Sequence, residues 1–195
     1  LSNWFDYWSV YKEEEVKRSD ETDDEYNVRQ LYLMKGSKSN AIMSAFREAG
    51  LPYETHYEGV YVLSTLEDMP AYDVLQAGDR ITKVNGEQLT SSEQLMTYIQ
   101  DQSEGSAIQI EIVRDDEIIE TSVETKVNPE NDKLGIGIVL VDDITVETDP
   151  KVEIDSSTIG GPSAGLMFSL EIYNQLVKED MTKGYTIAGT GTIDE

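Results

Sequence analysis

One serine of this chain lies in a setting where its hydroxyl could do chemistry. Ser163 is flanked by residues that give the backbone room or a fixed turn, namely Gly160, Gly161, Pro162, Ala164 and Gly165. Glycine and proline are common at the start of a helix, so these neighbours can simply form a structural turn with Ser163 as the helix cap. They can instead let backbone N–H groups approach a bound anion. A third interpretation is a nucleophilic serine whose flanking N–H groups stabilise an oxyanion.

Two further observations disfavour a nucleotide site and a Ser-His-Asp triad. No Lys-Ser/Thr pair and no Gly-x-Gly-x-x-Gly spacing accompanies the glycines, so nucleotide binding is weakly supported and we expect no cofactor. A nucleophilic serine needs a base, and His56 is the only histidine of the chain. A lone histidine near a domain junction is more often structural than catalytic. A Ser-His-Asp triad is therefore disfavoured.

The composition excludes several other classes of function. The net charge is −24, which repels nucleic acids and anionic membrane surfaces. The chain has no cysteine, which excludes disulfides, thiolate metal sites and a cysteine nucleophile. No ligand spacing with a turn glycine occurs in the acidic stretch 13–25, and we predict no metal site.

Periodicity divides the chain into three parts. Apolar residues at helical spacing predict an amphipathic helix over about 24–49, ended by Gly50. The predicted apolar face contains Leu31, Met34, Ala41, Ile42, Ala45 and Ala49. From Tyr57 to Val127 short β-type segments alternate with turn residues, and a helix is expected from Ser92 to about Gln102.

The last part, after the turn-rich stretch 128–132, is expected to be an α/β domain. Strands are predicted at 135–141, 152–154 and 185–188, with a helix over 163–177. The expected apolar face of that helix holds Leu166, Leu170, Tyr173 and Val177.

The middle part resembles a known peptide-binding module. The run Ala77-Gly-Asp-Arg-Ile-Thr-Lys-Val-Asn-Gly86 resembles the strand and hairpin signature of PDZ domains, and the resemblance covers about residues 57–126. It implies an extended peptide paired to a strand edge, with its carboxylate on backbone N–H groups. The expected peptide-binding residues are Glu58, Gly59, Val60, Tyr61 and Val62 of the loop and strand, and Leu95, Met96 and Ile99 of the helix. Whether C-terminal or internal segments bind stays open.

The serine segment resembles a protease family. Residues 159–170 and 187–193, Ile-Gly-Gly-Pro-Ser-Ala-Gly-Leu-Met-Phe-Ser-Leu and Ile-Ala-Gly-Thr-Gly-Thr-Ile, closely resemble Lon serine proteases. Together with the PDZ-like module they resemble the membrane-anchored Lon-like PDZ proteases of Gram-positive bacteria. The resemblance implies a Ser-Lys dyad in which Thr190 supports the lysine. If the register of that strand were shifted by one residue, the opposite side chains would face inward, and Thr192 could support the lysine in place of Thr190.

No residue of this sequence completes that dyad convincingly. Lys178 lies roughly 22 Å from Ser163 along the same helix, Lys183 follows in a charged loop, and Lys38 is expected to snorkel or pair with a carboxylate. The resemblance therefore implies a dyad lysine beyond Glu195. An acidic residue is common in the family where this chain has Gly160, which leaves Asp149 and Asp155 as candidates for a carboxylate.

The sequence thus predicts an α+β protein in which a PDZ-like module is inserted into a truncated Lon-type α/β proteolytic domain. The expected parts are 1–56, the N-terminal Lon-like part; 57–127, the PDZ module; and 128–195, the proteolytic part. The implied function is a serine endopeptidase that acts on polypeptides, inactive in this fragment. The alternative is a non-catalytic peptide-binding or assembly module. Family resemblance also implies an upstream membrane anchor, an extracytoplasmic location and a possible homo-oligomer.

Overall fold

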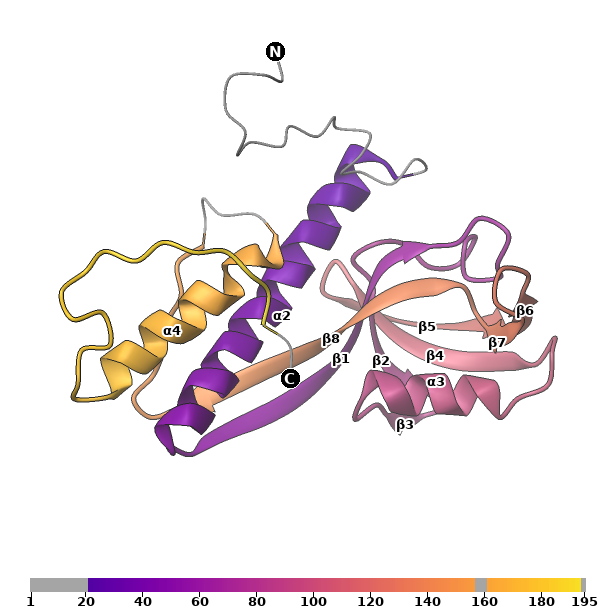
Figure 1. Cartoon of the computed structure of the whole chain (residues 1–195). Coiled ribbons are helices and arrows are strands. Elements are labelled where there is room, and N and C mark those ends of the chain that lie inside the picture. Colours follow the sequence, from indigo (N-terminus) through magenta and orange to yellow (C-terminus); the bar gives the residue numbers. More distant parts are fainter. Residues whose placement is uncertain (1–20, 157–160, 194–195) are drawn as a thin grey trace, which may run out of the picture.

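The structure is a computed structural model that describes residues 21–156 and 161–193. A twisted antiparallel sheet with one short helix forms one half, and two longer helices form the other half (Figure 1). The helices are α2 (Asp23–Ala49), α3 (Ser92–Gln100) and α4 (Gly165–Leu176), and a short 3-10 helix, η1 (Pro162–Ala164), precedes α4. The strands are β1 (Tyr53–Thr65), β2 (Arg80–Val84), β3 (Glu87–Gln88), β4 (Ala107–Arg114), β5 (Glu117–Glu124), β6 (Lys126–Asn128), β7 (Lys133–Gly135) and β8 (Ile138–Thr148).

The first helix forms where the sequence predicts it. Thr22 and Glu25 make a reciprocal capping box at its start, and Gly50 ends it in a left-handed conformation. The predicted apolar face is only partly right, because Leu31 is 63% exposed whereas Ser37 and Ser39 are buried. The reason is that α2 contacts both β8 and α4, so its buried surface is wider than one apolar stripe. Residues 1–20, which include most of the acidic stretch 13–25, lie outside the described residues.

The sheet has the strand order β5-β4-β2-β1-β8, and every neighbouring pair is antiparallel. The predicted turn at Asn85-Gly86 is confirmed, since both residues have positive φ and β2 pairs with β3 across it. The buried carboxylate of Asp79 accepts two hydrogen bonds from Arg114. A boundary at residue 127 would separate β8 from the sheet to which it is hydrogen-bonded.

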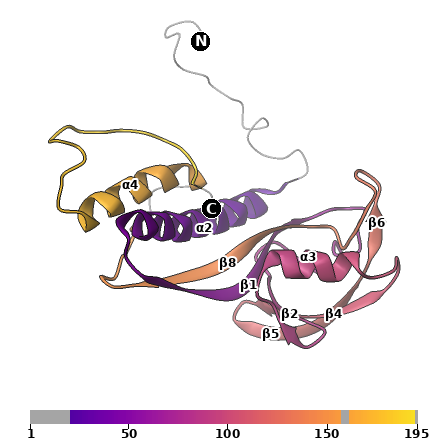
Figure 2. The ribbon, with the colours of Figure 1, turned by 60° about the horizontal axis from the view of Figure 1, so that its bottom comes forward.

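Strands β1 and β8 form a long ribbon that joins the two halves. Their pairing runs from Thr65 with Ile138 to Tyr53 with Thr148, with register shifts at two places. One end of the ribbon belongs to the sheet and the other lies beneath α2 (Figure 2). Two separate cores result: one inside the sheet half, and one around Ala41, Ala45, Phe46 and Ile172 between α2 and α4.

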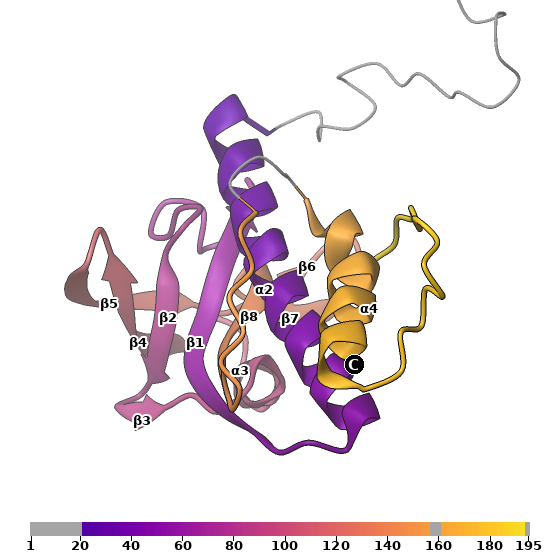
Figure 3. The ribbon, with the colours of Figure 1, turned by 90° about the vertical axis from the view of Figure 1, so that its left-hand side faces the viewer.

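The C-terminal part differs from the predicted α/β domain. Helix α4 lies beside α2 (Figure 3) and buries Gly165, Ser169 and Ile172, while Leu166 and Leu170 are each 37% exposed. Neither 152–154 nor 185–188 forms a strand, because no other strand pairs with these segments among the described residues. In residues 21–156 and 161–193 no helix combines the length and apolar character needed to cross a membrane.

A buried carboxylate fixes α2 to the sheet. The side chain of Asp143 on β8 is fully buried and forms ion pairs with Lys35 on α2 and, at 3.1 Å, with Arg80 on β2. Next to it the rings of Tyr32 and Tyr61 stack with centroids 3.7 Å apart. Buried charges are tolerated only when paired, so this contact constrains how α2 can lie.

We expect Asp143→Ala to lower the free energy of unfolding by about 3 kcal/mol, because Lys35 and Arg80 lose their common counter-charge. Urea unfolding followed by circular dichroism measures the change. The matched control is Glu153→Ala, which removes a carboxylate from an exposed pair with Lys151 and should leave stability unchanged. Equal effects of the two changes would show that Asp143 does not hold the halves together.

Candidate functional site

An apolar groove of about 240 Å³ lies between α3 and the start of β8. One wall is formed by Leu95, Met96 and Ile99 of α3, and the other by Ile138 and Leu140 of β8. The floor is completed by Leu66, Met69 and the segment 134–137. Such a groove suits an extended chain with apolar side chains.

The backbone beside this groove can accept an additional strand. β8 is the last strand of the sheet, and its Ile138–Leu140 portion pairs with β1 on one edge only. The opposite edge faces α3. An unpaired strand edge presents N–H and C=O groups to which an extended peptide can add.

The segment that enters β8 forms a tight glycine loop at the end of the groove. Gly137 has a φ of +86°, and a Cβ there would overlap the side chain of Met69. The carbonyls of Ile136 and Gly137 accept hydrogen bonds from Ala71 and Leu66. Within the described residues no acceptor meets the N–H groups of Ile136 and Gly137. These donors can therefore receive a carboxylate.

One carboxylate sets the position of the groove helix. Asp142 accepts hydrogen bonds from the Ser92 backbone N–H and hydroxyl, both at 3.0 Å, at the start of α3. It also accepts one from the Tyr57 hydroxyl at 2.7 Å. Burial and this hydrogen bond raise the pKa of Tyr57, so the phenol stays a donor. The wall of the groove is thus tied to β8 itself.

The structure brings together only some of the predicted peptide-binding residues. Leu95, Met96 and Ile99 line the groove, but Glu58, Gly59, Val60, Tyr61 and Val62 do not. Val60 and Val62 are fully buried in the core of the sheet, and Tyr61 stacks on α2. The correction has a simple cause: β1 is hydrogen-bonded on both edges, by β2 and β8, so it has no edge for a peptide.

The sequence predicts one buried strand over 135–141 and therefore misses the loop between Gly135 and Ile138. Instead β7 ends at Gly135, and β8 begins at Ile138. The signal that could have found the loop is the pair Gly135 and Gly137, with one residue between them, because glycine in a strand often marks a bend or close backbone approach.

The serine loop lies on the other half of the molecule, against α2. Ser163 is exposed and sits in η1, directly before α4. Its carbonyl accepts hydrogen bonds from the Gly191 N–H at 2.7 Å and from the Thr190 hydroxyl at 3.2 Å. The buried Ser37 hydroxyl donates to the Pro162 carbonyl at 3.0 Å. The structure therefore places Thr190 beside Ser163.

The resemblance places the lysine of the expected dyad beyond Glu195. Among the described residues, no lysine, histidine or aspartate forms a hydrogen bond with the Ser163 hydroxyl. Lys38 instead donates to the carbonyl of Ile154 at 3.1 Å. Thr192 is exposed, and Asp149 and Asp155 are exposed on the segment before the loop. Gly160 lies outside the described residues, whereas Gly161, Pro162, Ala164 and Gly165 lead into α4.

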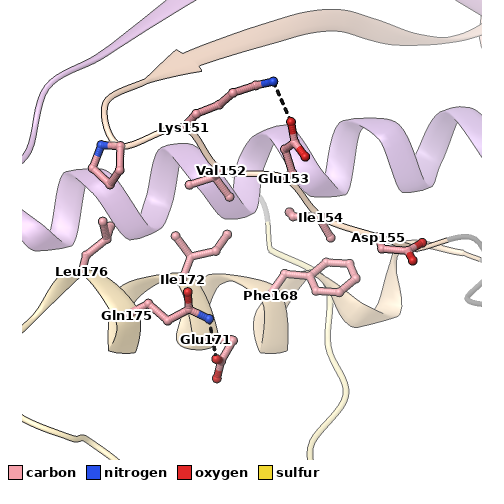
Figure 4. A pocket seen from close by; sticks show the side chains of 11 residues that line it. Lys151, Val152, Glu153, Ile154, Asp155, Phe168, Glu171, Ile172, Gln175 and Leu176 are labelled. Atoms are coloured by element: carbon pink, nitrogen blue, oxygen red, sulfur yellow. Dashed lines mark hydrogen bonds and ion pairs between the residues drawn. The ribbon is translucent and has the colours of Figure 1, made fainter.

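A cleft of about 490 Å³ runs between α4 and the segment 150–155. Figure 4 shows Val152 and Ile154 above Phe168 and Ile172, with Asp155 toward one end. The polar side chains at its rim pair among themselves, as Lys151 with Glu153 and Gln175 with Glu171. The cleft adds apolar surface beside the serine loop.

Comparison with known proteins assigns the sheet half to a family. A family model described as "PDZ domain" matches residues 43–125. The PDZ domain of the SdrC-like protein from Listeria monocytogenes is 36% identical, over 44% of this chain and 90% of that one, with a TM-score of 0.41. The chain belongs to the PDZ-domain family. The matched residues end before β8, which completes the PDZ sheet in the structure.

Other solved structures have similar sequence identities, coverages and TM-scores. The PDZ domain of the SdrC-like protein from Listeria innocua is 35% identical, over 42% of this chain and 92% of that one, with a TM-score of 0.40. A protein from Geobacillus thermodenitrificans is 34% identical, over 42% and 95% of the two chains, with a TM-score of 0.38. The search of curated proteins finds no match.

The close contact between Gly137 and Met69 leads to a prediction for the PDZ loop. Gly137→Ala should destabilise the domain more than Gly86→Ala, because Gly86 also has positive φ but a Cβ there meets open space. The Gly86 change should cost only the backbone strain, about 1–2 kcal/mol. Adding Met69→Ala to Gly137→Ala should recover at least about 0.5 kcal/mol relative to additivity in urea unfolding. Strict additivity would contradict the contact.

Proposed function

We propose that the PDZ groove binds C-terminal tails of polypeptides. The peptide would add to the open edge of β8, with apolar side chains against Met96 and Ile99 and its carboxylate on the glycine loop. The observation that carries this proposal is the coincidence of three features at one place: an unpaired strand edge, an apolar groove and unpartnered N–H groups.

Charge supports the choice of a C-terminal carboxylate. Among the described residues, Lys133 is the only charged one that lines the groove, and it lies next to the glycine loop in a chain of net charge −24. An acidic protein attracts an anionic group only where local donors and positive charge outweigh the overall field. The loop end of the groove is such a place.

Peptide binding can be tested with a pair of matched methionines. Met96 is 44% exposed in the groove, and Met181 is 46% exposed on the other half. Met96→Glu should weaken binding of an apolar C-terminal peptide by about tenfold or more, since a contact worth the burial of one apolar side chain is lost. Met181→Glu should leave the Kd, measured by calorimetry, unchanged. Equal binding by both variants would exclude this groove.

The same experiment separates C-terminal from internal recognition. Amidation of the peptide C-terminus, or Lys133→Gln, should weaken binding, while Lys178→Gln outside the groove should not. Equal affinity for the free and amidated peptides would contradict the carboxylate assignment and favour an internal segment.

We also propose that the C-terminal part is a Lon-like serine endopeptidase region in which Ser163 is the nucleophile. Its support is the resemblance together with the contacts of Thr190 and Gly191 to the Ser163 carbonyl. In this proposal a lysine takes the Ser163 proton as the hydroxyl attacks the peptide carbonyl, and backbone N–H groups stabilise the oxyanion. The same lysine returns the proton to the leaving amine as the C–N bond breaks and the acyl-serine forms. Water, deprotonated by the lysine, then hydrolyses the ester, which releases the acid and restores the Ser163 hydroxyl. The location implied by the resemblance, the extracytoplasmic face of the membrane, belongs to the same proposal.

The nucleophile can be tested in the full-length protein. Ser163→Ala should lower peptide hydrolysis by about three orders of magnitude or more, because no acyl-enzyme can form. Binding at the PDZ groove should persist in that variant, and Ser156→Ala should retain hydrolysis. Unchanged turnover by Ser163→Ala would favour the alternative, a peptide-binding or assembly module without catalysis.

A further inference from the structure

Three possible metal ligands gather on the exposed surface of the β1–β8 ribbon, away from both the groove and the serine loop. Glu54 and His56 come from β1, and Glu147 comes from β8. One ligand atom from each lies within 4.8 Å of the others. Glu54 and His56 are two positions apart and so share a face of the strand, and Glu147 is the register partner of Glu54.

The second observation is that the negative charges of Glu54 and Glu147 are poorly balanced. Glu54 and Glu147 stand directly opposite across the ribbon, an arrangement of like charges that destabilises a strand pair. Within the described part of the chain neither carboxylate pairs with a lysine or arginine. The closest cationic candidate is His56, whose Nε2 lies 3.8 Å from a Glu147 oxygen. A bound cation would remove this repulsion.

The donor set selects a class of ion. One imidazole and two carboxylates suit first-row divalent metals such as zinc, whereas magnesium and calcium prefer oxygen ligands alone. Around zinc the ligand atoms would have to close to about 2.0–2.2 Å from the ion. The side chains have freedom to do so, because those of His56 and Glu147 are 47% and 74% exposed.

We propose that Glu54, His56 and Glu147 bind one divalent transition-metal ion, with zinc as the best fit and water completing its coordination. The ion would join β1 to β8 outside the PDZ sheet. The sequence predicts no metal site because the ligands come from two strands far apart in the chain, and only the ribbon register brings them together.

The test is a zinc titration of the tag-free protein followed by NMR. His56 is the only histidine, so its imidazole signals need no assignment by mutation. These signals should shift and saturate at one equivalent of zinc. His56→Gln and Glu147→Gln should each weaken binding, measured by calorimetry, by at least about tenfold, because even second-shell changes have effects of that size.

The matched control is Glu124→Gln, which removes an exposed strand carboxylate from β5 and should leave zinc affinity unchanged. All four proteins should keep the same far-ultraviolet circular dichroism, since the altered side chains are exposed. Diffuse attraction to an acidic surface predicts the opposite pattern: no saturable His56 shift, or equal weakening by Glu124→Gln and His56→Gln. Either result, or equal displacement of zinc by magnesium, would overturn the proposal.

Discussion

The antiparallel pairing of β1 with β8 is the constraint on which the rest of the structure depends. It joins two segments far apart in the sequence, and one of its two register shifts, between Tyr57 and Gly59, comes just before the portion of β1 that pairs with β2. Register shifts of this kind bend a ribbon and increase its twist. The core of the sheet half contains residues of both strands, and the core between α2 and α4 includes Tyr53 of β1.

This pairing also decides where a peptide can bind. Once β8 covers one edge of β1 and β2 covers the other, the open edge on that side of the sheet, in the part of the chain that the structure describes, is that of β8 itself. The adjacent residues Asp142 and Asp143 contact different helices. Asp142 accepts a hydrogen bond at the start of α3, and Asp143 forms an ion pair with Lys35 of α2. One strand thus sets both the groove helix and the long helix.

Helix α2 connects this strand to the serine loop. Ser39 donates to the Ile144 carbonyl of β8, Lys38 to Ile154, and Ser37 to Pro162 beside Ser163. Three consecutive polar residues thereby reach three different segments, which explains why the buried surface of α2 is not purely apolar. Hydrogen bonds of this kind satisfy polar groups that would otherwise be costly to bury between the packed elements.

The sequence by itself determined the helix over about 24–49 and its end at Gly50, the Asn85-Gly86 hairpin and the PDZ signature at 77–86, because these depend on local spacing and turn chemistry. It also indicated that Leu95, Met96 and Ile99 share a helix face. The tertiary structure alone decided which strand has the free edge, that a loop at Ile136-Gly137 separates β7 from β8, and that α4 buries Ile172 rather than Leu166. Those outcomes depend on which distant segments pair, and a strand pattern specifies its faces but not its neighbours.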